Sequence, residues 1–371
     1  MNILNKITGI HSIDIKVEAK GHGCVNWNGP TELTGNDGKT VKNHSLPKLR
    51  GFSNKTGKVK EENGYEYKVN VNDISLKDTP MYVSENCFKH HIFKREMPYH
   101  LGKLEEKHVA NFLLSPAGFL RGYAITSQVP IMKTSPMLVE DLVEIDGISN
   151  YENLTTASSK EGSETGGLYT KTTVGDTRYI GYLSINIEEL QFVSCDGLFG
   201  RSAVGLSFTQ DELVDLASRM TLMLNDLKTN EELDPHVEFS ACWVKKGSLA
   251  EVGEAGFLLN EDAQQIYIDW ALERLGSLCI KQAGGWLAVQ NVVADYNSGK
   301  HFRIKDDFNN ARQQKSESFA IYYRQANKQE ISNSQKATEK SLSNGAKRRN
   351  KKLGKKAAKA NSDDSQAALT E

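Results

Sequence analysis

The clearest structural signal in the chain lies near its N-terminus, in the stretch Ser12-Ile13-Asp14-Ile15-Lys16-Val17-Glu18-Ala19-Lys20. Apolar residues stand at every second position of this stretch, and charged residues stand between them. A period of two gives a β-strand one apolar face and one polar face. The stretch therefore predicts a half-buried strand whose apolar side packs on a core.

Further elements follow on the C-terminal side of this strand. Ser84 and Thr209 are candidate N-caps of two helices, and Glu212 completes a capping box with Thr209. Hydrophobic periodicity predicts two more helices, over 103–114 and 261–282. It predicts extended segments or strands over 80–83, 122–131, 183–187, 237–243, 286–293 and 319–323.

Two long polar stretches interrupt these elements. Residues 21–78 are rich in Gly, Asn and Lys, with one possible strand pair near 65–71, and residues 146–176 are rich in Gly, Ser and Thr. Long stretches without periodicity are usually excursions from a core, and they often carry function. The order of the surrounding elements is typical of a split β-α-β core. We therefore expect an α+β fold, with an RRM- or ferredoxin-like core over 1–325 and large insertions at these two places.

The chain is nearly neutral, but its charges are unevenly distributed. Its 371 residues include 46 Lys and Arg and 47 Asp and Glu, a net charge of −1. From Asn333 onward there are ten Lys and Arg against four Asp and Glu, so this end carries +6 and the rest carries −7. The composition of residues 326–371 predicts a disordered basic tail. Such a tail is either solvated or a non-specific phosphate-binding arm.

Common catalytic and metal-binding signatures are absent from the sequence. The segment 35–40 has two residues between its glycines where a P-loop needs four. There is no H-E-x-x-H motif, no nucleophile elbow and no Rossmann fingerprint. The adjacent His90 and His91 would point about 100° apart on a helix, which does not favour a shared metal. These patterns predict no catalytic residue, no metal and no cofactor.

The cysteines and the apolar runs indicate where the protein resides. The five cysteines are odd in number and include no C-x-x-C pair, which predicts neither a disulfide framework nor a zinc site. No run approaches the about 18 apolar residues of a membrane span, and the N-terminus lacks a signal-peptide pattern. We therefore expect a reducing, cytoplasmic location.

Basic residues near the ends of the predicted sheet are the strongest functional candidates. Cations beside a sheet with a glycine-rich projection are typical of proteins that bind single-stranded nucleic acid. The start of the helix after Ser84 also presents backbone amides, which together with Lys89 suit a phosphate. The alternative for each cation is an exposed basic surface without a ligand. The candidates are Lys48, Arg50, Ser84, Asn86, Lys89, His90, Lys94, Arg95, Arg121, Lys133, Lys245 and Lys246.

One of these stretches resembles a known motif. Residues 80–91, P-M-Y-V-S-E-N-C-F-K-H-H, resemble the extended-segment-to-helix motif of the RAMP superfamily. The match falls on Pro80, Ser84, Phe88 and Lys89. Glu85 and His90 stand where many members have a turn glycine and a second basic residue. The resemblance implies that Lys89 contacts the phosphates of a CRISPR guide RNA.

Two more stretches are similar to backbone subunits of Cascade-type CRISPR effector complexes. Residues 176–190 are similar to the strand after the thumb hairpin of those subunits, which places the thumb at 150–173. The segment F-L-R-G-Y, residues 119–123, is similar to the type I-F lineage and its compact variants. The thumb residues implied by this match are Tyr151, Leu168, Tyr169 and Lys171.

The resemblance implies a non-catalytic subunit. Its copies would polymerise along the spacer of the guide RNA and present it for base pairing with target DNA. The implied partners are the guide RNA, target DNA, further copies of the chain and other Cascade subunits, without a membrane. One alternative is a type III-like RAMP subunit that cleaves target RNA, for which Asp37 is the only candidate. Another is a ferredoxin-like interaction module that binds no nucleic acid.

Overall fold

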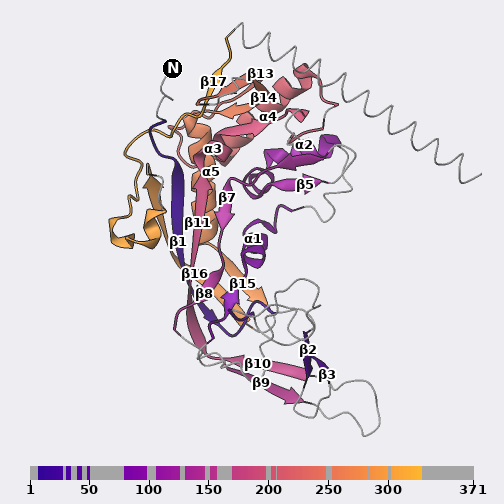
Figure 1. The fold of residues 1–371 in the computed structure, drawn as a ribbon, viewed down its shortest axis with the longest axis vertical. Helices are drawn as coiled ribbons and strands as arrows, with labels where there is room; N and C mark the ends of the chain where they lie inside the picture. Colours follow the sequence, from indigo (N-terminus) through magenta and orange to yellow (C-terminus); the bar gives the residue numbers. More distant parts are fainter. Residues whose placement is uncertain are drawn as a thin grey trace, which may run out of the picture.

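The computed structural model describes residues 7–27, 31–34, 40–43, 48–50, 79–97, 106–125, 130–146, 151–156, 169–197, 202–205, 207–247, 253–282, 285–299 and 302–327. An antiparallel sheet of seven strands lies at the centre of a mixed α+β fold (Figure 1). Its strand order is β15-β16-β1-β11-β8-β4, and β7 also pairs with β11. The bounds are β1 (Ser12–His22), β4 (Tyr82–Val83), β7 (Met137–Val139), β8 (Leu142–Glu144), β11 (Asp176–Asn186), β15 (Cys279–Gln282) and β16 (Gly285–Asn297).

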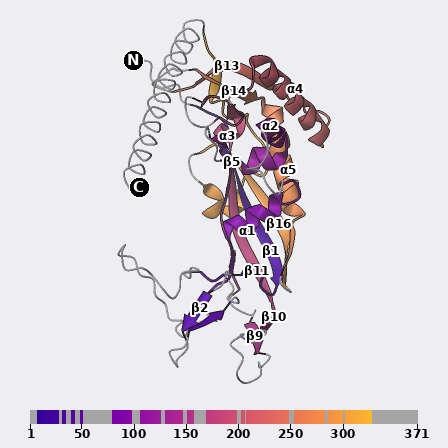
Figure 2. The same ribbon diagram turned by 90° about the vertical axis from the view of Figure 1, so that its right-hand side faces the viewer.

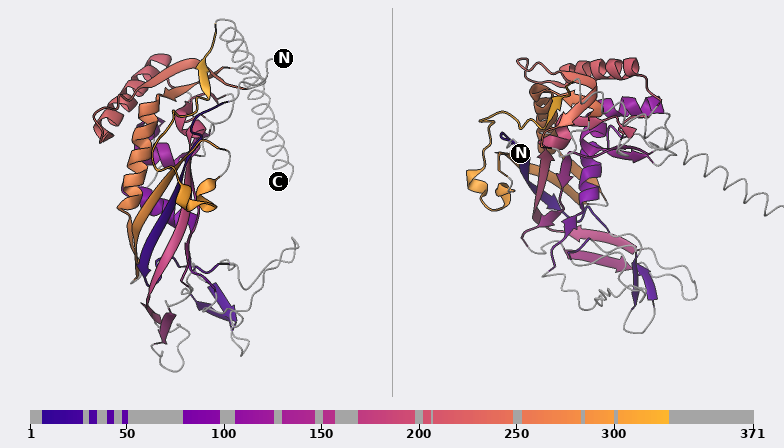
Figure 3. Two further views of the ribbon diagram at one scale, coloured as in Figure 1. Left: turned by 90° about the vertical axis from the view of Figure 1, so that its left-hand side faces the viewer. Right: turned by 45° about the horizontal axis from the view of Figure 1, so that its top comes forward.

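The two faces of this sheet are covered differently. Ile13, Ile15 and Val17 of β1 are fully buried, as their alternation predicts, and they face the side that carries the helices α1 (Glu85–Phe93) and α5 (Glu261–Gly276). The side chains of alternate residues point to the other face. A segment that we call the strap, residues 302–317, lies over that face and contains the short turns η6 (Arg303–Lys305) and η7 (Phe308–Asn310) (Figures 2 and 3).

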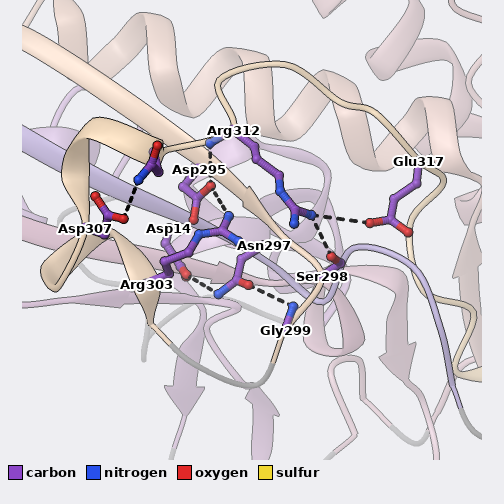
Figure 4. Close-up of polar contacts among 10 residues, drawn as sticks. Asp14, Asp295, Asn297, Ser298, Gly299, Arg303, Asp307, Arg312 and Glu317 are labelled. Carbon is purple, nitrogen blue, oxygen red and sulfur yellow. Dashed lines mark hydrogen bonds and ion pairs between the residues drawn. The ribbon is translucent and has the colours of Figure 1, made fainter.

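The strap is held by a buried carboxylate pair. Asp14 of β1 and Asp295 of β16 are direct cross-strand partners, and both are buried (Figure 4). Asp295 Oδ1 accepts hydrogen bonds from Arg303 Nη2 at 2.5 Å and from the Arg312 backbone N–H at 2.7 Å. Ser184 and Asn297 donate to Asp14, while burial raises the pKa of Asp14. Both buried carboxyls thus have donors, as buried charges require.

A smaller second layer lies at the upper end of the molecule in Figure 1. Its four-stranded sheet has the order β12-β14-β13-β17 and is packed against α4. The predicted capping box at the start of α4 is confirmed, because Glu212 N–H donates to Thr209 Oγ1 and Thr209 N–H donates to the Glu212 carboxylate. The bounds are α3 (Ile187–Gln191), β12 (Phe192–Ser194), α4 (Gln210–Leu227), β13 (Val237–Lys245), β14 (Glu254–Leu259) and β17 (Tyr323–Gln325).

Three hairpins and the helices α2 and η4 complete the described part of the chain. Hairpins β2–β3 and β9–β10 both lie at the lower end, opposite α4 (Figures 1 and 2). The π-helix η4 follows α2 and leads into the hairpin β5–β6. The bounds are β2 (Thr31–Thr34), β3 (Thr40–Asn43), α2 (Glu106–Leu114), η4 (Ala117–Arg121), β5 (Tyr123–Ile125), β6 (Ile131–Lys133), β9 (Tyr151–Thr156) and β10 (Tyr169–Val174).

Several element boundaries differ from the sequence predictions. The helix predicted over 261–282 ends at Gly276, because residues 279–282 pair with β16 as strand β15. The strand predicted over 122–131 is split into β5 and β6, and the last strand begins at Tyr323 instead of Phe319. Strand β14 was missed. The possible strand pair near 65–71, and the basic tail beyond 327, lie outside the described residues.

Candidate nucleic-acid interface

Helix α1 is fixed from both ends. Ser84 has the extended backbone of an N-cap, yet its hydroxyl accepts a hydrogen bond from Asn26 Nδ2 at 3.0 Å and does not cap the helix. At the other end, Arg274 of α5 donates from Nε to the Ile92 carbonyl at 2.9 Å. A cation is favourable at a helix C-terminus. Phe88 and Ile92 are buried beneath the helix, so its remaining face is turned outward.

The start of α1 already holds an anion from the protein itself. Asp141 Oδ1 accepts the backbone N–H of Glu85 at 2.8 Å, and Asp141 Oδ2 pairs with Arg50 at 3.0 Å. A carboxylate at a helix N-terminus meets the positive end of the helix dipole. The prediction of a phosphate held by the amides after Ser84, with Asn86 beside it, is therefore wrong for the Glu85 amide, although exposed Asn86 remains near the surface.

Two predicted cations come together beside the start of α1. Leu49 forms a bridge with Met81, which brings the chain around Lys48 and Arg50 alongside the Pro80–Val83 segment. The Lys48 Nζ lies 5.9 Å from the centre of the Tyr82 ring, and the Arg50 guanidinium lies 5.4 Å from it. The ring is partly exposed. An aromatic ring with cations over it is a surface on which a base can stack.

Lys89 of α1 and Arg121 of η4 form a second, half-buried cationic pair where η4 contacts α1. Burial lowers the pKa of Lys89, and the nearby charge of Arg121 lowers it further, while Glu85 acts in the opposite direction. Arg121 is the last residue of η4, and its Nε is buried without a hydrogen-bond partner. Gly122 then turns the chain with a φ of +70°. Within the described residues, neither Lys89 nor Arg121 forms an ion pair, so a ligand anion could satisfy both.

The C-terminal part of α1 adds further charge. Lys94, Arg95 and His90 are exposed, as expected of surface candidates. The adjacent His91 is buried and lies 3.1 Å from Lys94 Nζ, and burial lowers its pKa. The two histidine rings meet edge to face. Within the described ranges, no group of three or more His, Cys, Asp or Glu side chains could hold a metal ion.

Three of the predicted RNA-binding lysines do not belong to this surface. Lys133 is only 5% exposed and donates to the Thr134 carbonyl at 2.7 Å, and burial lowers its pKa to about 8. Its place in the hairpin β5–β6 turns it over the ring of Phe119, away from solvent. Lys245 and Lys246 lie at the end of β13 in the second sheet, and Lys245 is ion-paired with Glu188.

The thumb prediction concerns the hairpin β9–β10. The two strands pair with Tyr151 opposite Val174 and Tyr169 opposite Thr156. Tyr151, Tyr169 and Lys171 stand on these strands, while Leu168 and Asp37 lie outside the described residues. The roles of these five residues therefore stay predictions.

Sequence reasoning missed two residues of this interface. Tyr82 was quoted in the motif but not singled out, although an aromatic residue beside basic residues is a usable signal for base stacking. No local sequence pattern identifies Asp141, because it lies 56 positions after Glu85, the residue whose N–H it accepts. The pairing of β4 with β8 brings the two segments together.

Comparison with known proteins identifies the family of the chain. Residues 9–326 match the family model described as "Type I-Fv CRISPR-associated protein Cas7fv-like". No curated protein matches the chain. No helix of the described part is long and apolar enough to cross a membrane. The match covers most of the sequence, and it confirms the predicted resemblance to a compact variant of the type I-F backbone subunits. The chain therefore belongs to the Cas7fv-like family of type I-Fv CRISPR effector subunits.

Proposed function

We propose that the protein is a non-catalytic backbone subunit that binds CRISPR guide RNA along the outward side of α1. The observation that carries this is the meeting of cations from three distant segments around one helix. Lys48 and Arg50 precede α1, Lys89 stands on it, Lys94 is its C-cap, and Arg121 follows α2. The charges of Lys48 and Lys94 both act on Cys87, and that of Arg121 acts on Lys89. Such a surface binds the phosphates of a strand without reading its sequence.

The folding topology is consistent with an RRM-like core. The central strands run in the order β16-β1-β11-β8, and all neighbouring pairs are antiparallel. Helices α1 and α2 connect β1 to β7 and β8, and α5 precedes β16. This order supports a split β-α-β core with further strands at its edges. In this proposal the strap closes one face of the sheet, and the RNA follows the helix side.

Several copies of the protein would assemble on one guide RNA, because the phosphates repeat along the strand. Each copy would bind one stretch of the guide, and the hairpin β9–β10 would serve as the thumb that meets the next stretch. Bases left open between copies would pair with target DNA, which delegates sequence recognition to base pairing. Other Cascade subunits would complete the complex.

The purified full-length protein tests this proposal. We expect an absorbance ratio at 260 to 280 nm that reveals co-purified RNA, and a long regular assembly by size exclusion with light scattering. Nuclease treatment should reduce this assembly to a monomer or small oligomer. A protein-like ratio, or a mass that survives complete RNA removal, would favour the interaction module. Cleavage of complementary RNA that is lost in Asp37→Ala would favour the ribonuclease.

A further inference from the structure

Helix α4 and the residues after it carry a negatively charged surface, in contrast to the positively charged surface around α1. Residues 210–234 contain seven Asp and Glu against one Arg and one Lys. The acids of this acidic face are Asp211, Glu212, Asp215, Asp226, Glu231, Glu232 and Asp234, of which all but Glu212 are exposed. The two cations offset only two of these acids, because Arg219 lies 3.9 Å from Asp215 and Lys228 lies 3.5 Å from Glu231. The face therefore keeps a net charge of −5.

The same helix also exposes apolar side chains. Val214 is 49% exposed and Leu222 is 65% exposed. They stand eight residues apart, so they lie on one side of the helix, two turns from each other. Leu213, Leu216, Met220 and Leu224 already supply the buried side of α4. Val214 and Leu222 therefore have no role in the core and are accessible to a partner that binds this side of α4.

One segment of the chain matches this surface in charge. Residues 347–359 contain eight Lys and Arg, one Leu and no acidic residue. These cations are Lys347, Arg348, Arg349, Lys351, Lys352, Lys355, Lys356 and Lys359. This segment carries +8 and the rest of the chain carries −9, so a strongly basic segment and the acidic face of α4 have complementary charge. The single Leu353 could contact Leu222 or Val214.

The path of the chain places this segment within reach. The last strand, β17, pairs with β13 through Gln325 and Trp243. Strand β13 is itself joined to α4, because the Val237 N–H donates to Thr221 Oγ1 at 3.0 Å. About 20 residues separate the end of β17 from the basic segment, and they can span up to about 66 Å. Helix α4 has 18 residues and is about 27 Å long.

We propose that residues 347–359 bind in cis to the acidic face of α4. While bound there, the basic segment is withheld from RNA phosphates, and a polyanion competes with α4 for it. The tail is then neither a solvated appendage nor a permanent phosphate-binding arm. This inference concerns the protein without RNA, and it stands whether or not the RNA-binding proposal is correct.

Zero-length cross-linking tests the contact. A carbodiimide joins lysine amines to carboxylates in direct contact, so the full-length protein, freed of nucleic acid, is treated and its cross-linked peptides are identified by mass spectrometry. We expect links from the lysines of 347–359 to Asp211 and Asp215, and their loss at about 0.5 M salt because of screening. In a mixture of isotopically heavy and light protein, the links should join peptides of the same label. Links that mainly join heavy to light peptides would overturn the cis contact.

A pair of matched variants separates specific docking from general charge attraction. The variant Asp226→Lys with Glu232→Lys reverses the charge of two exposed acids of the face. It keeps Asp211 and Asp215, whose cross-links to residues 347–359 report on docking. Loss of two exposed charge contacts with the basic segment should reduce these cross-links by about 5-fold. The control, Asp306→Lys with Glu317→Lys, reverses two exposed acids of the strap and should leave the links unchanged. Circular dichroism confirms that both variants are folded. Equal effects of the two variants would overturn the proposal.

Discussion

The helix side of the central sheet has two cations that lack the ion pairs formed by the cations of the strap. On the strap side, Arg303 pairs with Asp295 and Lys305 pairs with Glu140. On the helix side, Arg50 pairs with Asp141, whereas Lys89 and Arg121 form no ion pair among the described residues. The two faces thus differ in what their cations already bind. A cation that lacks an internal partner is available to a phosphate, whereas a paired one mainly holds the fold together.

This difference predicts opposite outcomes for substitutions on the two faces. Removing a strap cation should cost stability and leave RNA affinity unchanged. Removing Lys89 or Arg121 should cost RNA affinity and leave stability nearly unchanged. The predictions below test this division, from the largest expected effect to the smallest.

Arg303→Ala should have the largest effect on stability. It leaves the fully buried Asp295 without its charged partner, and loss of one partner of a buried pair costs about 3–5 kcal/mol. Urea unfolding measures the free energy of unfolding. The matched variant Lys305→Ala removes a more exposed pair and should cost about 0–1 kcal/mol. Equal losses for the two variants would mean that burial does not distinguish them.

Lys133→Met tests the lysine that is buried instead of binding RNA. Burial holds its pKa at about 8 in the folded protein, against 10.5 normally. Between these values the unfolded chain binds more protons, so the stability of the wild type should rise with pH through this window. The penalty below the window amounts to up to about 3 kcal/mol.

The methionine variant should lack this rise. It should therefore be more stable than the wild type near pH 7, with the difference shrinking as the pH approaches 10. Urea unfolding at several pH values between 7 and 10 measures both proteins. A difference that stays constant with pH would show that the Lys133 ammonium is not destabilised by burial.

Asp141 offers a smaller and more selective test. Asp141→Asn removes a negative charge next to Arg50 and keeps an acceptor for the Glu85 N–H, whereas Asp141→Ala removes both. Only the alanine variant should lose stability, by about 0.5–2 kcal/mol, as for other helix caps. Both variants should bind single-stranded RNA more tightly, because a charge that repels phosphate is gone. If RNA affinity changed only in the alanine variant, it would depend on stability and not on the lost charge. That result would contradict the placement of the RNA at α1.

The sequence predicted what depends on neighbouring residues. The alternation of β1 and the capping box of Thr209 and Glu212 are local patterns, and both are confirmed. The end of α5 was misplaced because Cys279–Gln282 continues an apolar pattern, and its pairing with β16 is a contact that no local pattern shows. An α+β fold was expected, but neither the size of its antiparallel sheet nor the strap that covers one of its faces was.

The candidate site was predictable to a similar extent. Lys89 and Arg121 were identified as basic residues near predicted element ends, and the fold brings them together across 32 positions of sequence. The failures at Lys133 and at the start of α1 have one cause. Whether a cation or a helix terminus already has a partner depends on residues distant in sequence, such as Glu189, whose carbonyl lies 3.4 Å from Lys133 Nζ, and Asp141.

The salt dependence of RNA binding tests the central claim most directly. The measurement is the equilibrium affinity for two single-stranded RNAs of unrelated sequence, over a range of salt concentrations, for Lys89→Ala, Arg121→Ala, the double variant and the control Lys245→Ala. Each lost phosphate contact should reduce the slope of log affinity against log salt by about 0.7, equally for both RNAs. The double variant should lose about twice as much, and Lys245→Ala should match the wild type. Unchanged slopes for Lys89→Ala and Arg121→Ala, or a loss confined to one RNA sequence, would contradict a phosphate-binding surface on α1.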